Sequence, residues 1–160
     1  MQTLEPSRNL FGMQRRTLDP RLLGRFAEIG FLASEFGLHD AAQRLFMLLT
    51  QLREGHPSSL VALAMVRARA GRIEQAIEEL RAVIAHYPEC DLARAMLGTM
   101  LVHARLPGAL DLFRAVIASN ADNAAIQISE AWIDLAGQTE GTQDCTEPVA
   151  EIFRYHNVRP

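Results

Sequence analysis

The chain repeats its pattern of apolar and small residues every 34 residues, and this period limits the folds open to it. A period of about 20 to 50 residues is typical of proteins in which one supersecondary unit stacks on the next. We therefore expect an array of similar units. The matched positions are Gly37 and Gly71, Ala42 and Ala76, Phe46 and Leu80, Leu49 and Val83, then Ile29, Leu63 and Leu97, and Gly30, Ala64 and Gly98.

Within each unit, apolar residues recur three and four residues apart, which predicts two amphipathic helices per unit. Asp19 and Pro20 predict the first helix start, because aspartate caps a helix and proline fits its first turn. Gly37 and Gly71 predict the ends of first helices. The sequence thus predicts an all-α, right-handed solenoid of three helix hairpins plus a C-terminal capping helix. The predicted helices are 20–36 with 40–53, 58–70 with 74–86, 91–104 with 108–119, and the capping helix 122–136.

The third hairpin departs from the pattern at its turn. Arg105 replaces the turn glycine, and Ala109 follows Ala76 by 33 residues instead of 34. Because proline can start a helix, Pro107 predicts a turn that is one residue shorter than the others. Small residues within the hairpins predict a close approach of their two helices. These small residues are Gly30, Ala42, Ala64 and Ala76.

The segments outside the array are interpreted from composition. Residues 1–19 are predicted to be a flexible N-terminal segment, 20–137 the helical domain, and 138–160 a loop with a short C-terminal helix or tail. Residues 137–147 are polar and have no apolar period, which predicts the loop. Val149, Ile152 and Phe153 predict the short helix.

Composition and charge argue against several classes of protein. A net charge of −3 gives no electrostatic case for binding nucleic acid or an anionic membrane. No apolar run approaches the ~18 residues of a transmembrane helix, and the N-terminus lacks the apolar core of a secretory signal peptide. Cys90 and Cys145 form no CxxC motif, which predicts two free thiols in a reducing compartment. We therefore expect a cytoplasmic protein.

No constellation of residues predicts catalysis. The five histidines share no HxxxH or HExxH spacing, so no metal site is expected. Glu130 and Asp134 lie four residues apart, but paired catalytic carboxylates need a cleft and unequal environments, so we interpret them as a solvated face. No GxSxG, P-loop or GxGxxG motif occurs. We expect no enzyme activity, no catalytic residue and no cofactor.

A groove along the first helices is the predicted binding site, because stacked repeats present a continuous surface to partners. Its register positions hold no charged residue, whereas a groove for a peptide carboxylate needs cationic side chains. An apolar groove suits an amphipathic helix of a protein partner. Coverage by the N-terminal segment or by a second copy is an alternative. The predicted contact residues are Ala27, Phe31, Val61, Met65, Ala68, Leu92, Ala95, Thr99 and Val102, with Met65 near the centre, and the further groove positions are Gly24, Ser34 and Ser58.

The repeat positions resemble a known family consensus. Over roughly residues 20–120, the chain resembles the tetratricopeptide repeat (TPR) family. The residues that carry this resemblance are Phe26, Ile29, Gly30, Ala33, Gly37, Ala42 and Phe46, then Leu60, Leu63, Ala64, Gly71, Ala76, Leu80 and Pro88.

A narrower resemblance concerns residues 70–81 and 93–101, which are similar to small TPR-type chaperones and Hrp-type accessory proteins of bacterial type III secretion. It implies a non-catalytic chaperone or adaptor that sequesters an amphipathic helix of a secreted subunit, such as the needle protein, and prevents premature polymerisation. The alternative is a structural component of the secretion apparatus that self-associates through the same face. A homodimer is also left open.

Overall fold

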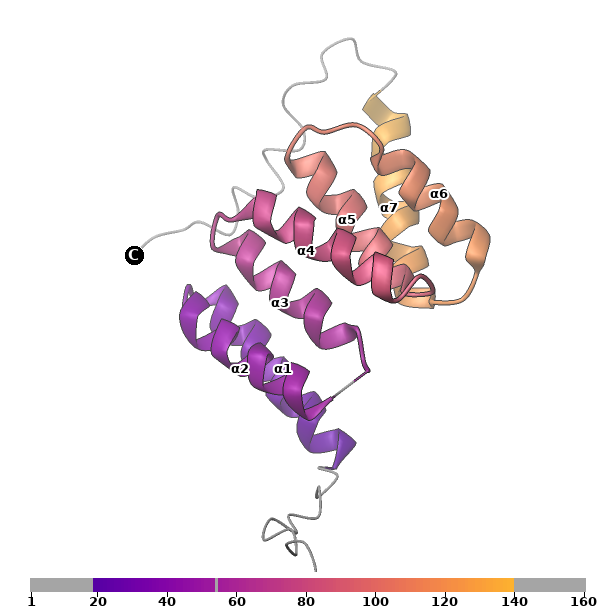
Figure 1. Cartoon of the computed structure of the whole chain (residues 1–160). Coiled ribbons are helices and arrows are strands. Elements are labelled where there is room, and N and C mark those ends of the chain that lie inside the picture. The colour runs from indigo at the N-terminus through magenta and orange to yellow at the C-terminus, as the bar shows by residue number, and fades with distance from the viewer. Residues whose placement is uncertain (1–18, 54, 140–160) are drawn as a thin grey trace, which may run out of the picture.

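A computed structural model of the chain describes residues 19–53 and 55–139, which form seven helices and no strand (Figure 1). Each helix contacts the next along the chain, and α3 also contacts α1 and α5, so the first helices of the hairpins lie in a row. The predicted array of three helix hairpins with a C-terminal helix is confirmed. The helices are α1 (Pro20–Glu35), α2 (His39–Leu52), α3 (Ser58–Arg69), α4 (Ile73–His86), α5 (Asp91–His103), α6 (Ala109–Ser119) and α7 (Asn123–Thr139).

Local sequence signals set most of the helix ends. The Asp19 carboxylate accepts a hydrogen bond from the backbone N–H of Arg21 at 2.9 Å, and Asp122 caps α7 in the same way through Ala124 at 3.0 Å. Gly37 and Gly71 adopt φ values of 77° and 82° just after α1 and α3. These left-handed residues end the helices, because glycine has no β-carbon to oppose that conformation.

The turn of the third hairpin differs from the prediction. α5 ends at His103 and α6 begins at Ala109, so this turn is longer than the turns after α1 and α3, not shorter. Pro107 does not start α6, because Gly108 has a φ of 98°, which a right-handed helix cannot contain. Arg105 takes the register position of the turn glycines with a φ of 55°. An arginine in this conformation costs roughly 1–2 kcal/mol.

The C-terminal helix is longer than expected. α7 continues past Ala136 through Gly137 to Thr139, where a loop was predicted. A glycine inside a helix costs about 1 kcal/mol relative to alanine, which weakens a helix without necessarily ending it. The predicted N-terminal segment before Asp19 and the short helix near 148–155 lie outside the described residues.

Apolar clusters run through the whole stack. One joins α1, α2 and α3 around Phe46 and Leu49, and a larger one extends from α3 to α6 around Leu80 and Phe113. α7 closes the C-terminal end, where the Trp132 ring stacks on Phe113 with ring centroids 6.4 Å apart. The apolar core therefore extends along the array in successive clusters, as expected when each hairpin buries its neighbour's apolar face.

Two glycines allow the helices of a hairpin to approach closely, as predicted for Gly30. A β-carbon added to Gly30 would lie 2.8 Å from the Phe46 ring, and one added to Gly98 would lie 2.5 Å from the Phe113 ring. Both rings are 1% exposed, so they have little room to move. The aromatic rings therefore fill the space that the glycines leave.

Replacing Gly98 with alanine is expected to destabilise the protein by about 1–3 kcal/mol, because the added methyl group overpacks the Phe113 ring. Gly24→Ala is the matched control, since a β-carbon there meets no atom within 4 Å. That variant should gain about 0.5–1 kcal/mol through helix propensity. Urea unfolding measures both changes, and an unaffected Gly98→Ala variant would contradict the close packing of α5 on α6.

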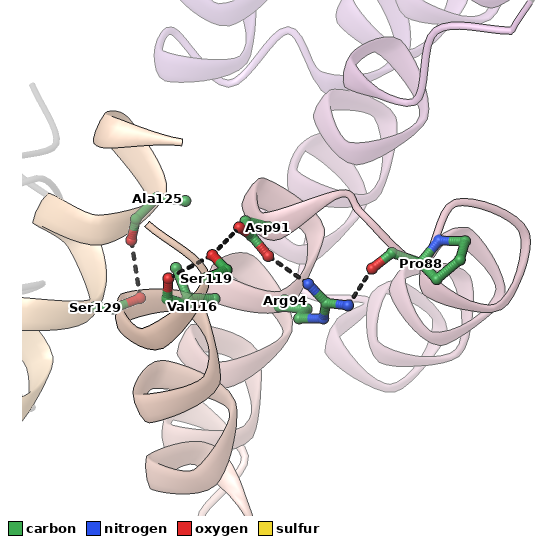
Figure 2. A network of polar contacts seen from close by, with 7 residues as sticks. All are labelled: Pro88, Asp91, Arg94, Val116, Ser119, Ala125 and Ser129. Atoms are coloured by element: carbon green, nitrogen blue, oxygen red, sulfur yellow. Dashed lines mark hydrogen bonds and ion pairs between the residues drawn. The ribbon is translucent and has the colours of Figure 1, made fainter. Parts of the chain in front are cut away.

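A polar network fixes the start of α5 (Figure 2). The Asp91 carboxylate is 3% exposed and accepts hydrogen bonds from the Arg94 guanidinium and the Ser119 hydroxyl. Arg94 also donates to the carbonyl oxygen of Pro88, in the turn before α5. The network therefore ties the end of α6 and the α4–α5 turn to the first turn of α5.

Asp91→Ala is expected to cost about 1–3 kcal/mol, because it leaves Arg94 and Ser119 without their shared acceptor in a part-buried site. Asp111→Ala is the control, since the Asp111 and Arg114 side chains are 88% and 70% exposed and lie 3.8 Å apart. Exposed pairs of this kind contribute about 0–1 kcal/mol. Chemical denaturation compares the two variants, and equal losses would refute the structural role of the network.

Candidate partner-binding site

A hollow of about 320 Å³ lies on the face formed by the first helices α1, α3 and α5. Val61 forms part of its floor, since this side chain is 2% exposed. Phe31 forms a wall and packs against the buried Phe46 ring at a centroid distance of 4.9 Å. The lining residues are Ala27, Phe31, Arg53, Ser58, Ser59, Val61, Ala62, Met65, Arg69, Leu92 and Met96.

Five of the nine predicted contact residues line this hollow. Helical spacing explains the convergence, because residues four apart lie on the same helix face and the 34-residue register repeats that face on the next hairpin. Of the further groove positions, Ser58 also lines the hollow, whereas Ser34 is buried. The five are Ala27 and Phe31 on α1, Val61 and Met65 on α3, and Leu92 on α5.

The other four predicted residues lie outside the lining. Ala95 is fully buried and packs with Val116 and Ala125, so it has no surface to offer a partner. Thr99 donates its hydroxyl to the Ala95 carbonyl at 3.0 Å, within its own helix. Ala68 and Val102 are half-buried against the larger core cluster.

The expectation of an uncharged groove is wrong for this hollow, because Arg53 and Arg69 line it. Arg69 Nη1 lies 3.6 Å from Glu35 Oε1, and the two side chains are 46% and 51% exposed. Such an exposed pair contributes about 0–1 kcal/mol, so the Arg69 guanidinium is available to a carboxylate of a partner. The hollow therefore combines apolar walls with cationic groups.

Some of the missed residues had a sequence signal. Met96 and Arg69 lie beside predicted positions on α5 and α3, so a wider helical stripe would have included them. Arg53 had no such signal, because it follows the second helix of the first hairpin and not a groove helix. The missed lining residues are Arg53, Ser59, Ala62, Arg69 and Met96.

Two groups on or beside α5 have shifted pKa values, and neither lines the hollow. Burial lowers the pKa of His103, whose ring packs edge-on against Trp132 at 6.2 Å. Burial raises the pKa of the Cys90 thiol, with a smaller opposing effect from a backbone hydrogen bond at Ala93. Both net shifts favour the neutral form, and a neutral thiol is a weak nucleophile.

A second hollow of about 330 Å³ lies between α3 and α4, with Leu60, Leu63 and Tyr87 among its walls. Its lining includes the ion pair between Arg67 and Glu79, which makes it less suited to an apolar anchor. Within the described part of the chain, no cluster of three or more potential metal ligands occurs. None of the described helices combines the length and apolarity that crossing a membrane requires.

Comparison with protein families matches residues 57–100 to the tetratricopeptide repeat. The match covers α3 and α4 and most of α5, which are the elements that carry the clearest repeat positions. Comparison with curated protein sequences gives no match.

Several solved structures have a similar fold. PcrH from Pseudomonas aeruginosa is 20% identical over 71% of this chain and 88% of PcrH, with a TM-score of 0.57. PcrH in complex with the chaperone binding region of PopD is 19% identical over 79% and 97%, with a TM-score of 0.57. The Yersinia enterocolitica type III secretion translocator chaperone SycD is 15% identical over 71% and 89%, with a TM-score of 0.56. The predicted similarity to TPR-type secretion chaperones is confirmed at the level of the fold.

Proposed function

We propose that this protein is a non-catalytic chaperone that holds an apolar segment of a type III secretion protein in the hollow lined by α1, α3 and α5. The observation that carries this proposal is the hollow itself, where Phe31, Val61 and Met65 converge on the face that TPR-like arrays present to partners. The likeness in fold to PcrH and SycD supports the choice of partner class.

The proposed partner is a translocator and not the needle subunit. PcrH is known in complex with the chaperone binding region of PopD, and SycD is a translocator chaperone. Nothing in these likenesses supports the needle protein that the sequence resemblance first implied.

The size of the hollow limits what enters it. A volume of about 320 Å³ is at the lower end of ligand-pocket sizes, so it holds anchor side chains and not a whole helix. We propose that one or two large apolar side chains of an amphipathic helix enter the hollow. Met65 and Met96 adapt to their shape, because methionine is flexible and polarisable.

The two arginines add a requirement on the bound segment. Arg53 and Arg69 favour an acidic residue beside the apolar anchors, since guanidinium groups bind carboxylates through charge-assisted hydrogen bonds. This role would place the protein in the cytoplasm, where a secretion substrate is held before export, in agreement with its predicted free thiols.

Binding of translocator peptides tests the proposal. Peptides that tile a translocator from the same secretion system are titrated against the full chain, with needle-subunit peptides as the comparison. One apolar translocator segment should bind saturably at one peptide per chain. Binding of needle peptides alone would overturn the choice of partner. If no secretion substrate binds, and Met65→Glu instead abolishes self-association, the protein is a structural component that assembles through the groove.

A further inference from the structure

The hollow lined by α1, α3 and α5 has a charge that the segments before and after the helical array match unequally. It combines apolar walls with the cations Arg53 and Arg69. Residues 1–18 hold three arginines and one glutamate, so like charge opposes their approach. Residues 140–151 hold no cation, and their four carboxylates are attracted to the hollow. These carboxylates belong to Glu140, Asp144, Glu147 and Glu151.

The acidic tail, which we define as residues 140–160, also carries apolar side chains of suitable size. Val149, Ile152 and Phe153 are spaced three and four residues apart, which predicts one apolar face of a short helix. A hollow of about 320 Å³ admits one or two large apolar side chains, and Ile152 and Phe153 are two such neighbours. The tail therefore has the features that we propose for a bound secretion substrate, namely apolar anchors and acidic residues.

α7 leads the tail toward one edge of the groove. Its early residue Ala125 packs with Ala95 of α5, and its later residue Trp132 packs edge-on against His103 at a ring-centroid distance of 6.2 Å. α7 therefore runs in the same direction as α5 and ends near the C-terminal end of α5, in the upper part of Figure 1. Arg69 precedes His103 by one 34-residue repeat, so it marks the same end of α3. The tail thus follows α7 at the edge of the groove where Arg69 lies.

The tail is long enough to reach the centre of the hollow. α7 ends at Thr139, two helical turns beyond Trp132, which is roughly 10 Å past the edge of the groove. α7 contacts α5, and α5 contacts α3, so α3 lies two helix spacings away, or about 20 Å. With Met65 one turn inside the edge, the gap from Thr139 to Met65 is roughly 25 Å. Residues 140–148 span up to about 30 Å when extended, which is enough to bring the apolar anchors into the hollow.

The order of groups along the tail matches the order of groups along this path. A chain that crosses α5 from the end of α7 meets Arg69 first and then Met65, one turn further along α3. Along the tail, Asp144 and Glu147 come before the apolar anchors. The carboxylates are then placed beside the guanidinium, where they form charge-assisted hydrogen bonds, while the anchors enter the apolar part of the hollow.

We propose that the acidic tail occupies the hollow of its own chain when no secretion substrate is bound, with Ile152 and Phe153 as anchors and Arg69 paired with a tail carboxylate. The tail then covers the apolar walls of an empty chaperone. A substrate must displace the tail, so segments with strong anchors bind and weak apolar peptides are rejected. This role in substrate selection rests on the proposed function, whereas occupancy of the hollow by the tail does not.

A spin label on Cys145 of the full chain tests the occupancy without any substrate. Cys145 lies just before the apolar anchors, and Cys90→Ser removes the other thiol. The label should broaden the methyl NMR signals of Met65 and Met96, which line the hollow, far more than the signal of Met47 on α2. Similar broadening of all three signals would overturn the proposal, and so would an absence of broadening.

Two tail variants of the labelled chain make this test specific. Phe153→Glu should remove most of the broadening, because a charged side chain does not enter an apolar hollow without a large cost. Val158→Glu is the matched control, since it adds the same charge in the same tail outside the anchors, and it should leave the broadening unchanged. Broadening that Phe153→Glu preserves would contradict the proposal. Broadening seen only between labelled and unlabelled copies would place the tail of a second copy in the hollow and also overturn it.

Titration with the translocator segment measures the competition. Phe153→Glu should lower the apparent dissociation constant about threefold or more, because a tail bound roughly two-thirds of the time leaves one-third of the hollows open. Val158→Glu should bind as the wild type does. If the segment binds the wild type and Phe153→Glu equally, the tail does not compete and this inference fails, while the proposed function stands. If no translocator segment binds, the proposed function fails, and the spin-label experiment still decides whether the tail occupies the hollow.

Discussion

Met65→Glu is expected to weaken binding of the secretion substrate by about 30-fold or more while the protein stays folded. Met65 lines the hollow together with Val61, one turn earlier on α3, and Leu92 of α5. A carboxylate there removes an apolar anchor of the kind that typically contributes about 2 kcal/mol or more to binding. The new Glu side chain also lies four residues before Arg69 on the same helix, so it pairs with the Arg69 guanidinium. This guanidinium is the group that we propose binds a carboxylate of the partner.

The fold should survive this change because Met65 is only half-buried and its side chain borders the hollow. Isothermal titration with the bound translocator segment measures the affinity, and circular dichroism measures the melting temperature. Leu110→Glu adds the same charge on α6, outside the hollow, and should bind as the wild type does. Normal binding by Met65→Glu would show that the hollow is not where the partner docks.

Ala76→Glu is expected to unfold the protein. Ala76 is 0% exposed and lies in the larger core cluster, where α4 packs against α3. A carboxylate buried there without a partner costs several kcal/mol, a large part of the about 5–15 kcal/mol that stabilises a typical domain. The variant should lose its cooperative thermal transition and much of its helical circular dichroism signal.

Ala85→Glu is the control for this experiment, because Ala85 is an exposed alanine on the same helix. Its stability should stay within about 0.5 kcal/mol of the wild type. A well-folded Ala76→Glu variant would mean that α3 and α4 do not pack through this position. The repeat register, on which both the fold and the groove depend, would then need to be shifted.

The fold could be predicted from the sequence because its signals are local and repeated. Gly37 and Gly71 mark turns by the same backbone conformation, and Ala42 and Ala76 mark the same contact in successive hairpins. The third turn could not be predicted in this way. The packing of α5 against α6 decides whether Arg105 adopts a positive φ. It also decides where α6 begins, so the turn residues alone do not predict this turn.

The candidate site was predicted less completely, for a physical reason. A repeat position faces a groove only if no other helix covers it. Whether a helix covers it depends on how near the position lies to an end of the array. Val61 and Ala95 share one register position, yet Val61 lines the hollow, whereas Ala95 packs with Val116 of α6 and Ala125 of α7. Arg53 reaches the hollow from the end of α2, which no pattern on the first helices can indicate.

Methionine methyl NMR tests most directly the central claim that the partner binds in the hollow, because the described methionines lie at different places in the structure. Met65 and Met96 line the hollow, Met47 is 44% exposed on α2, and Met100 is buried. When the translocator segment is added to methyl-labelled protein, we predict large shifts of the Met65 and Met96 signals and little change at Met47. Shifts at Met47 without any change at Met65 and Met96 would contradict the account, because the partner would then bind outside the hollow.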